Sequence, residues 1–436
     1  MSLYSKTFYS SELTQLFSDR EAVAKLLQVE AALALAQGEA DIIPIEVAKT
    51  IADCCRVEAI DINALKTDVV LGGNVAIPLV KQLTKIIKNR DFEASKYVHL
   101  GATSQDIIDT ATVLTIKEYI LWLEKKLNDL EKVLIDLTHN HINTLMMGRT
   151  LLQQAKPMTF GLKTAGWLTS CTRHKERLNQ LKSRILRLQL GGAIGSGNAN
   201  ITEDVQQKTA DLLALDTSFP WQTQRDTFAE FASFLGILSG SLGKIAKDVS
   251  LLMQTEIGEV FEGASEGKGG SSTMPHKRNP VNCALIISNA TRTPGLVSTM
   301  LNAMPQEHER SAGNWHAEWE TLSQLMNLSA GSIEKTVDLI TFLEIDKERM
   351  LQNIEITNGL IYAEKVSLQL AKSSGKMQAH EAVKKACTLA IQQKRHLKDV
   401  VIEMHPNLEN IDDLFKPENA IGHSVFWVEK IISRYL

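Results

Sequence analysis

The chain has 436 residues, which is enough for a large hydrophobic core and predicts two or three domains. Its net charge of −4 and its pI of about 6.3 provide no positive field for nucleic acid or for an anionic membrane surface. No apolar run reaches the roughly 18 residues that a membrane-spanning helix needs. Glycine and proline are sparse, at 25 and 10 residues, and this composition favours a mostly helical fold.

The five cysteines are odd in number and show no C-x-x-C spacing. We interpret them as reduced thiols in the core. The first ten residues also lack the apolar core of a secretory signal peptide. Both observations predict a cytoplasmic protein.

The first polar cluster lies at residues 98–110, which read Val-His-Leu-Gly-Ala-Thr-Ser-Gln-Asp-Ile-Ile-Asp-Thr. Thr103 or Ser104 could cap the long helix that follows, and the acids after them suit its N-terminus. A helix N-terminus with hydroxyls is also a site for carboxylates. Capping alone does not account for His99, so we expect this cluster to be both a cap and an anion site.

Two long helices are predicted by a seam of apolar residues spaced alternately by four and three. The first seam runs from Ile116 to Leu137 and the second from Phe228 to Leu252. Three glycines, Gly236, Gly240 and Gly243, lie inside the second helix, and we interpret them as places where a neighbouring helix approaches closely. Residues 158–190 and 316–344 are also predicted to be helical. Helices this long favour self-association, although a monomeric bundle would explain the seams as well.

Two further polar segments carry an arginine. Residues 148–157 lie at a break between long helices, where Arg149 offers a two-pronged donor for a carboxylate and Thr150 and Gln153 offer neutral hydrogen bonds. A polar turn between helices is the simpler interpretation of this segment. Arg225, just before the second seam, is another candidate cation.

Residues 269–280 carry the strongest functional signal, Gly-Gly-Ser-Ser-Thr-Met-Pro-His-Lys-Arg-Asn-Pro. Two glycines free the backbone. Two hydroxyls, a histidine, two cations and an amide follow within ten residues. This pattern predicts a flexible loop that closes over a small polyanionic substrate. A helix begins near Asn282, and Thr293-Pro294-Gly295 is expected to kink it.

The motifs of cofactor and metal sites are absent from the sequence. Gly195-Ser196-Gly197 lacks the third glycine of a dinucleotide fold, and Gly267-Lys268 is not followed by Ser or Thr as in a P-loop. His308 and His316 do not form an H-E-x-x-H pattern. We therefore predict an enzyme with no cofactor and no catalytic metal.

The loop at 269–280 resembles the signature loop of the fumarase/aspartase superfamily. Other segments resemble its bacterial 3-carboxy-cis,cis-muconate cycloisomerase family, namely HLGATSQDIIDT (99–110), GRTLLQQAKPMTFGLKTAGW (148–167), PWQTQRDTFAEFASFLGILSG (220–240), SLLMQTEIGEVFE (250–262) and QEHERSAGNWHAEWETL (306–322). The resemblance implies an all-α homotetramer with a central bundle of long helices and active sites shared among subunits. It divides the chain into an N-terminal domain (1–108), a bundle (109–354) that carries the signature loop (265–282), and a C-terminal domain (355–436).

Leu151 separates this chain from the lyases of the superfamily, which carry histidine at the matching position. Lyases expel poor leaving groups and benefit from a general acid. A carboxylate that closes a lactone is already ionised near neutral pH, so it needs no base to attack. The sequence therefore favours lactonisation of a tricarboxylate diene to 4-carboxymuconolactone in protocatechuate degradation. The cycloisomerase family usually has a large aromatic residue at this position, so a related substrate is also open.

The resemblance implies the following roles. Lys277 and Asn279 would stabilise an enediolate-like charge, and Ser271, or alternatively His276, would deliver the proton to carbon. Substrate carboxylates would be held by His99, Thr103, Ser104, Arg149, Thr150, Gln153, Arg225, Ser272, Met274 and Arg278. Two other functions are open, an adenylosuccinate lyase-like elimination and a non-catalytic helical paralogue. Leu151 argues against the first, and the retained Ser271, Lys277 and Asn279 argue against the second.

Overall fold

The structure is a computed structural model that describes residues 3–263, 274 and 277–435. It is mostly helical, at 68% of residues, as the sequence predicts. The chain forms two compact units. Unit 1 contains Met1–Leu127, His174–Gly243 and Leu285–Glu334, and unit 2 contains Asn128–Arg173, Lys244–Ala284 and Lys335–Leu436. The three-domain division stays a prediction. Among the described helices, none is long and apolar enough to cross a membrane.

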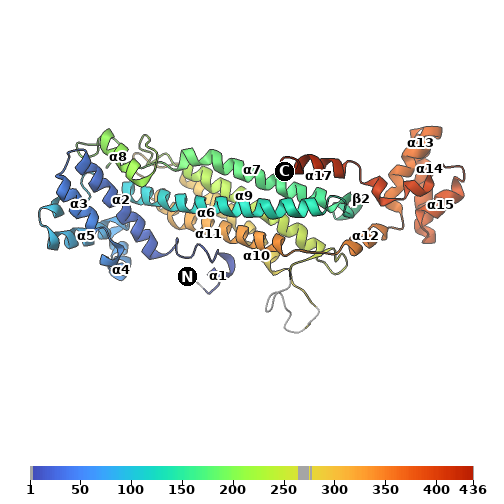
Figure 1. The fold of residues 1–436 in the computed structure, drawn as a ribbon, viewed down its shortest axis with the longest axis horizontal. Helices are drawn as coiled ribbons and strands as arrows, with labels where there is room; N and C mark the ends of the chain where they lie inside the picture. The colour runs from blue at the N-terminus through green and yellow to red at the C-terminus, as the bar shows by residue number, and fades with distance from the viewer. Residues whose placement is uncertain (1–2, 264–273, 275–276, 436) are drawn as a thin grey trace. The chain divides into compact units, whose positions relative to one another are not determined.

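Five long helices contribute residues to both units (Figure 1). They are α6 (Ser104–Asn140), α7 (Phe160–Ile185), α9 (Asp226–Leu252), α10 (Val281–Ala303) and α11 (Asn314–Thr341). Both predicted seams are buried along their whole length, on α6 and α9. In unit 1, Tyr119 on α6 meets Phe231 on α9 edge to face, with ring centroids 6.1 Å apart. The two predicted helices are therefore confirmed.

Close approach of α9 and α10 accounts for two of the three helix glycines. A Cβ atom on Gly236 would lie 2.7 Å from Val297 Cγ2, and one on Gly243 would lie 2.6 Å from Ala290 Cβ. Both distances are too short for carbon atoms, so larger residues would push the helices apart. A Cβ atom on Gly240 would meet no atom within 4 Å beyond the nearby backbone of its own helix, so the described part of this chain provides no close neighbour there.

Shorter helices complete unit 1. They are α1 (Ser5–Phe8), α2 (Asp19–Glu39), α3 (Ile45–Cys54), η1 (Val57–Ala59), α4 (Ile62–Gly72), α5 (Ala76–Arg90), η2 (Ala94–Tyr97) and α8 (Glu203–Leu213). Helix α2 packs against both α3 and α8. Ser18 caps its N-terminus, because the Ser18 hydroxyl accepts a hydrogen bond from the Glu21 amide at 3.2 Å and so satisfies a free donor of the first turn.

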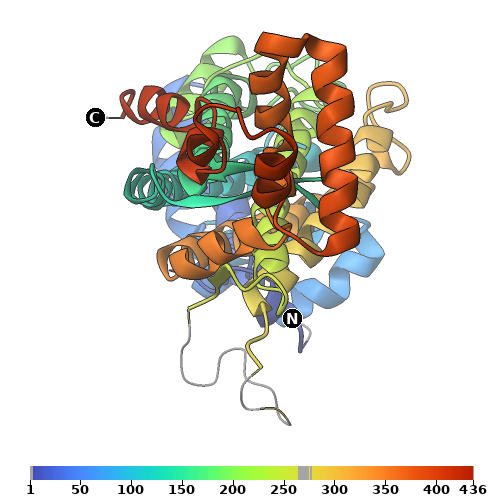
Figure 2. The same ribbon diagram turned by 90° about the vertical axis from the view of Figure 1, so that its right-hand side faces the viewer.

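The remaining elements belong to unit 2. They are β1 (Leu145–Thr150), β2 (Gln153–Thr159), β3 (Val260–Phe261), β4 (Glu344–Ile345), α12 (Lys347–Glu355), η3 (Leu360–Tyr362), α13 (Ala363–Ser374), α14 (Lys376–Gln393), α15 (Leu397–Met404), α16 (Ile411–Leu414), η4 (Pro417–Ala420) and α17 (Ser424–Ile432). Helices α13, α14 and α15, orange to red in Figure 2, enclose a core that includes Val366, Val383 and Leu397.

One feature differs from the sequence-based expectation. Residues 145–159 form an antiparallel hairpin of β1 and β2, whereas the sequence showed only a break between long helices there. Helix α10 begins at Val281, close to the predicted start near Asn282, and it continues through Pro294, where the predicted kink stays a prediction. Proline costs a helix one hydrogen bond and some steric strain, but packing of the helix can outweigh that cost.

Candidate active site

In unit 1, His99 is held by a buried acid from α2. His99 has a positive φ of 59°, and its Nδ1 lies 2.7 Å from Glu30 Oε1. Burial alone would lower the pKa of the imidazole, but the hydrogen bond and charge of Glu30 outweigh it, so the pKa is raised. A hydrogen bond at Nδ1 also fixes the orientation of the ring.

Thr103 and Ser104 lie at the start of α6, as predicted. The Thr103 amide donates to Asp106 Oδ2 at 3.0 Å, which is half of a capping box. The Thr103 hydroxyl instead accepts a hydrogen bond from Arg310 Nη1 at 2.8 Å. The Asp106 carboxylate therefore caps the helix N-terminus by accepting from the Thr103 amide. The hydroxyls of Thr103 and Ser104 are left for other partners.

A glycine-containing loop, residues 191–197, lies against the start of α6. Gly192 has a φ of 73°. A Cβ atom on it would lie 3.0 Å from Asn198 Nδ2 and 3.2 Å from the Gly101 carbonyl oxygen. Asn198 in turn donates to that same carbonyl at 2.9 Å. The positive φ and the absence of a side chain at Gly192 therefore favour this close approach of the loop to the α6 N-terminus.

Arg310 is a residue of this cluster that the sequence alone did not single out. Its guanidinium donates to Thr103 Oγ1 and, at 2.9 Å, to the Ala193 carbonyl oxygen. Among the described residues, its printed partners are a hydroxyl and a carbonyl oxygen and none is a carboxylate, so its charge is available to an anion. Residues 306–310 are all polar in the sequence, which indicates a site that includes Arg310. His308 and His316 direct the interpretation of this segment toward a metal motif instead, and the arginine is not picked out.

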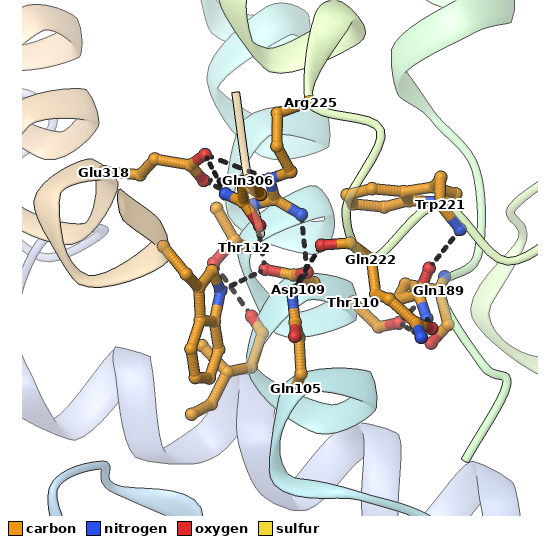
Figure 3. A network of polar contacts seen from close by, with 12 residues as sticks. Gln105, Asp109, Thr110, Thr112, Gln189, Trp221, Gln222, Arg225, Gln306 and Glu318 are labelled. Carbon is orange, nitrogen blue, oxygen red and sulfur yellow. Dashed lines mark hydrogen bonds and ion pairs between the residues drawn. The ribbon is translucent and has the colours of Figure 1, made fainter. Parts of the chain in front are cut away.

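Arg225 differs from its predicted role. The residue is 2% exposed, and Figure 3 shows its guanidinium between two carboxylates. Nη1 donates to Asp109 Oδ2 at 2.7 Å and Nε to Glu318 Oε1 at 3.0 Å. Burial would lower the pKa of this guanidinium, but the two acids raise it overall. Arg225 therefore joins α6, α9 and α11, and its charge is already neutralised.

A cavity of about 330 Å³ adjoins this ion-pair network in unit 1. Leu26, Ile108, Phe228 and Leu322 are among the side chains that line it. Such walls do not suit a polycarboxylate, which needs donors on several sides. We therefore place the candidate site at the α6 N-terminus.

In unit 2, Arg149 also has an internal partner. Nη2 donates to Glu259 Oε1 at 2.6 Å and Nη1 to Oε2 at 3.0 Å, in a bidentate pair. Asn353 donates to the same carboxylate at 2.8 Å. Nearby Lys163 has a lowered pKa, chiefly because it is buried and also because Lys244 and Arg149 are close.

Thr150 and Gln153 flank the exposed tip of the β1–β2 hairpin. They pair with each other across the turn. The two tip residues, Leu151 and Leu152, have φ values of 49° and 66°, and Leu151 is 97% exposed. Both central residues of a type I′ turn need positive φ, which usually selects asparagine and glycine. The proton-transferring position of the lyases thus lies at a solvent-exposed turn in this chain.

The signature loop is described only in part. Ser271, Ser272 and His276 lie outside the described residues. Lys277 is exposed, and its amide donates to the Met274 carbonyl at 3.1 Å. Asn279 lies just before α10 and is half-buried. Arg278 forms a bidentate pair with Glu344, with both distances 2.8 Å, and this pair joins the loop to β4.

The predicted site residues therefore form one set in each unit. His99, Thr103, Ser104 and Arg225 lie in unit 1, whereas the described residues Arg149, Thr150, Gln153, Met274, Lys277, Arg278 and Asn279 lie in unit 2. Arg310 adds a cation to the first set. Outside the undescribed segments, no three His, Cys, Asp or Glu side chains are grouped as metal ligands would be.

Comparison with known proteins identifies the family. A family model described as "Lyase" matches residues 6–295, and one described as "Adenylosuccinate lyase C-terminus" matches residues 359–431. The chain belongs to the fumarase/aspartase superfamily. It is 46% identical to a 3-carboxy-cis,cis-muconate cycloisomerase of Pseudomonas aeruginosa, over 99% of this chain and 96% of that protein.

Two further similarities support the same conclusion. The chain is 43% identical to the enzyme of the same name from Acinetobacter baylyi, over 97% of this chain and 96% of that one. The fold matches a crystal structure of the 3-carboxy-cis,cis-muconate lactonizing enzyme from Pseudomonas putida with a TM-score of 0.95 and 44% identity, covering 99% and 98% of the two chains. The all-α architecture of this superfamily is thereby confirmed.

Proposed function

We propose that the protein is a cycloisomerase that converts 3-carboxy-cis,cis-muconate to 4-carboxymuconolactone without a cofactor, in the degradation of protocatechuate. The observation that carries the proposal is 43–46% identity, over 92–99% of this chain, to four proteins named as this cycloisomerase. The absence of an acid at Leu151 fits this reaction better than an elimination.

The reaction forms one C–O bond and one C–H bond. A substrate carboxylate oxygen adds to the conjugated double bond, and the displaced electron pair moves onto a neighbouring carboxylate as an enediolate. Lys277 and Asn279 stabilise that charge. Ser271, or His276, then gives a proton to the carbon next to that carboxylate and is reprotonated from water. Because the nucleophile is tethered to its target, correct positioning provides much of the rate.

The electrostatics of the two residue sets support this assignment of roles. In unit 1, Arg310 carries a charge without a carboxylate partner among the described residues and contacts Thr103. His99, four residues before Thr103 in the chain, has a raised pKa that favours the imidazolium form. These groups suit a carboxylate that does not react. In unit 2, Lys277 is exposed while Arg278 is tied to Glu344, so among the described residues of this loop the lysine is the cation available to the developing charge.

The proposal is tested by mixing purified protein with 3-carboxy-cis,cis-muconate and following the loss of the conjugated-diene absorbance, with the lactone identified by NMR. Turnover in buffer treated with a chelator is the expected result. A Ser271→Ala variant should lose turnover by orders of magnitude while substrate binding changes little. Absence of diene loss with the wild-type protein would refute the proposal.

A lyase reaction is the second candidate function, and two observations favour testing it. The C-terminal match to adenylosuccinate lyase covers residues 359–431. Relatives at 33% and 35% identity are named N-acetyl-S-(2-succino)cysteine lyase and nitrosuccinate lyase. Adenylosuccinate in a parallel assay distinguishes the two. Cleavage of adenylosuccinate together with inertness toward the muconate would establish the lyase.

We further propose that the protein acts as a cytoplasmic homotetramer with active sites shared between subunits. Its cysteines are free in the structure, as expected for a reducing compartment.

A further inference from the structure

Asp106 is a buried carboxylate that accepts four hydrogen bonds from two separate segments of unit 1. Oδ2 accepts from the Thr103 amide at 3.0 Å and the Gly192 amide at 2.9 Å. Oδ1 accepts from the Gly191 amide at 2.9 Å and from Gln189 Nε2 at 3.1 Å. The side chain is fully buried, so water does not substitute for any of these donors.

Helix capping alone requires only one of the four contacts. The bond to Thr103 completes the cap, because an acid at the third helical position reaches back to the cap residue. The other three donors belong to residues 189–192, which are more than 80 positions away in the sequence. A fully ionised carboxylate has about four acceptor sites, and here all are used. The arrangement thus fixes a loop to a helix end.

The two segments joined by Asp106 are the two that Arg310 contacts. Arg310 Nη1 donates to the Thr103 hydroxyl, and Nη2 donates to the carbonyl of Ala193, the residue after Gly192. The relative position of Thr103 and Ala193 therefore sets the orientation of the guanidinium. The four hydrogen bonds of Asp106 involve neither Arg310 nor the Thr103 hydroxyl, so Asp106 acts on both groups through the backbone.

We propose that Asp106 is a positioning residue that orients Arg310 and Thr103 for a substrate carboxylate by clamping the loop 191–192 to the N-terminus of α6. The inference rests on the proposed function, because it presumes that Arg310 and Thr103 hold a carboxylate. That carboxylate is bound equally in the substrate and in the transition state, so its loss raises KM more than it lowers kcat.

The test is Asp106→Asn, which keeps the shape of the side chain and replaces one acceptor oxygen by an NH2 group. Two of the four bonds then become donor-against-donor contacts, whichever way the amide is oriented. We expect kcat/KM to fall by about 100-fold, because small misplacements of positioning groups cost that much. The larger part should appear in KM, and only a few-fold change in kcat.

Asn289→Ala provides the matched control in unit 1. Asn289 is fully buried and donates to two backbone carbonyls, those of Phe8 at 3.0 Å and Leu328 at 3.2 Å. Its loss removes a comparable buried polar contact from the same unit without touching the loop 191–192. A purely structural role for Asp106 predicts that both variants lose thermal stability and keep a normal KM for the folded fraction, and that result would overturn the proposal.

A second variant keeps the inference testable if Asp106→Asn does not fold. Gly192→Ala places a methyl group 3.0 Å from Asn198 Nδ2 and displaces the same loop while Asp106 remains. It should raise KM in the same way, and an unchanged KM would contradict the proposal. If the wild-type protein does not turn over the muconate, thermal-shift titration with tricarballylate replaces KM. Equal affinity of the wild type and the variants for that tricarboxylate would refute the positioning role independently of the reaction.

Discussion

The partners of four arginines show which of these cations are structural and which one is available to a substrate. Arg149, Arg225 and Arg278 each form a bidentate or double ion pair with acids of the chain, whereas the hydrogen bonds of Arg310 go to a hydroxyl and a carbonyl oxygen. A neutralised guanidinium attracts an incoming carboxylate weakly. Residue type alone did not reveal this difference, because Asp109 and Glu318 lie about a hundred positions from Arg225.

Replacing Arg310 by methionine should weaken substrate binding. Methionine keeps the aliphatic stem and removes the charge, and a hydrogen bond to a charged group is worth about 1.5–3 kcal/mol. We therefore expect KM for the muconate to rise by about 10- to 100-fold with a small change in kcat. Arg187→Met is the matched control, since Arg187 also donates to backbone carbonyls in unit 1, those of Ser183 and Thr217. Equal KM values for both variants would exclude Arg310 from the site.

Glu318 should make the stability of unit 1 depend on pH. Burial raises the pKa of its carboxyl, an effect that Arg225 only partly offsets. The folded state therefore binds a proton more tightly than the unfolded state, so this group stabilises the protein below its unfolded pKa of about 4.3 and the stabilisation is lost as pH rises through the folded pKa. Glu318→Gln imitates the protonated form and retains a partner for Arg225.

Calorimetric midpoints measured from pH 4 upward should thus fall less, or rise more, in Glu318→Gln than in the wild type. Asp106, whose pKa burial also raises, contributes the same sign in both proteins and cancels in the comparison. The exposed Glu320→Gln on the same helix controls for the change in net charge. Parallel pH profiles of Glu318→Gln and the wild type would contradict the prediction, because they would show that the pKa of Glu318 is the same in the folded and unfolded states.

At the scale of elements, the long helices could be predicted because their signal is local. A four-three spacing of apolar residues gives α6 and α9, and each seam residue proved buried. The β1–β2 hairpin could not be predicted, since its tip is Leu151-Leu152 and lacks the asparagine or glycine that marks such turns. The sequence places three glycines in α9 but does not show which of them contact a neighbouring helix. Gly236 and Gly243 meet α10, whereas Gly240 does not.

Leu152→Gly should stabilise the hairpin. A left-handed backbone costs a side-chain-bearing residue about 1–2 kcal/mol, part of which glycine returns through its more flexible unfolded state. The expected gain is about 0.5–1 kcal/mol, measured as a shift in the urea midpoint with constant m. Ala214→Gly, at a φ of 50° after α8, should give a similar gain away from the hairpin. A loss of stability confined to Leu152→Gly would mean that this leucine is packed against a second copy.

At the scale of the whole molecule, the two residue sets pose a question of assembly. Unit 1 supplies Arg310, Thr103 and Asp106, and unit 2 supplies Lys277 and Asn279. A single sequence indicates which residues have a chemical role. It does not show whether the residues of one site come from one copy of the chain or from several, because that depends on the contacts between the surfaces of the copies. The proposed tetramer answers the question by building each site from unit 1 of one copy and unit 2 of another.

Mixed assemblies of two inactive variants test this arrangement. Thr103→Val/Ser104→Ala damages unit 1 and Lys277→Ala damages unit 2, and each should be nearly inactive alone. If the two sets come from different copies, random co-assembly after co-expression places two intact sets together in about a quarter of the sites, and that fraction of wild-type activity returns. Pairing Thr103→Val/Ser104→Ala with Arg310→Met provides the control when activity is measured well below the wild-type KM, where Arg310→Met also loses most of its rate. Both changes lie in unit 1, so no intact unit 1 exists in that mixture, and activity should not exceed that of the Arg310→Met sites. Failure of the first pair to recover activity, with assembly confirmed by light scattering, would place both sets of each active site in one chain.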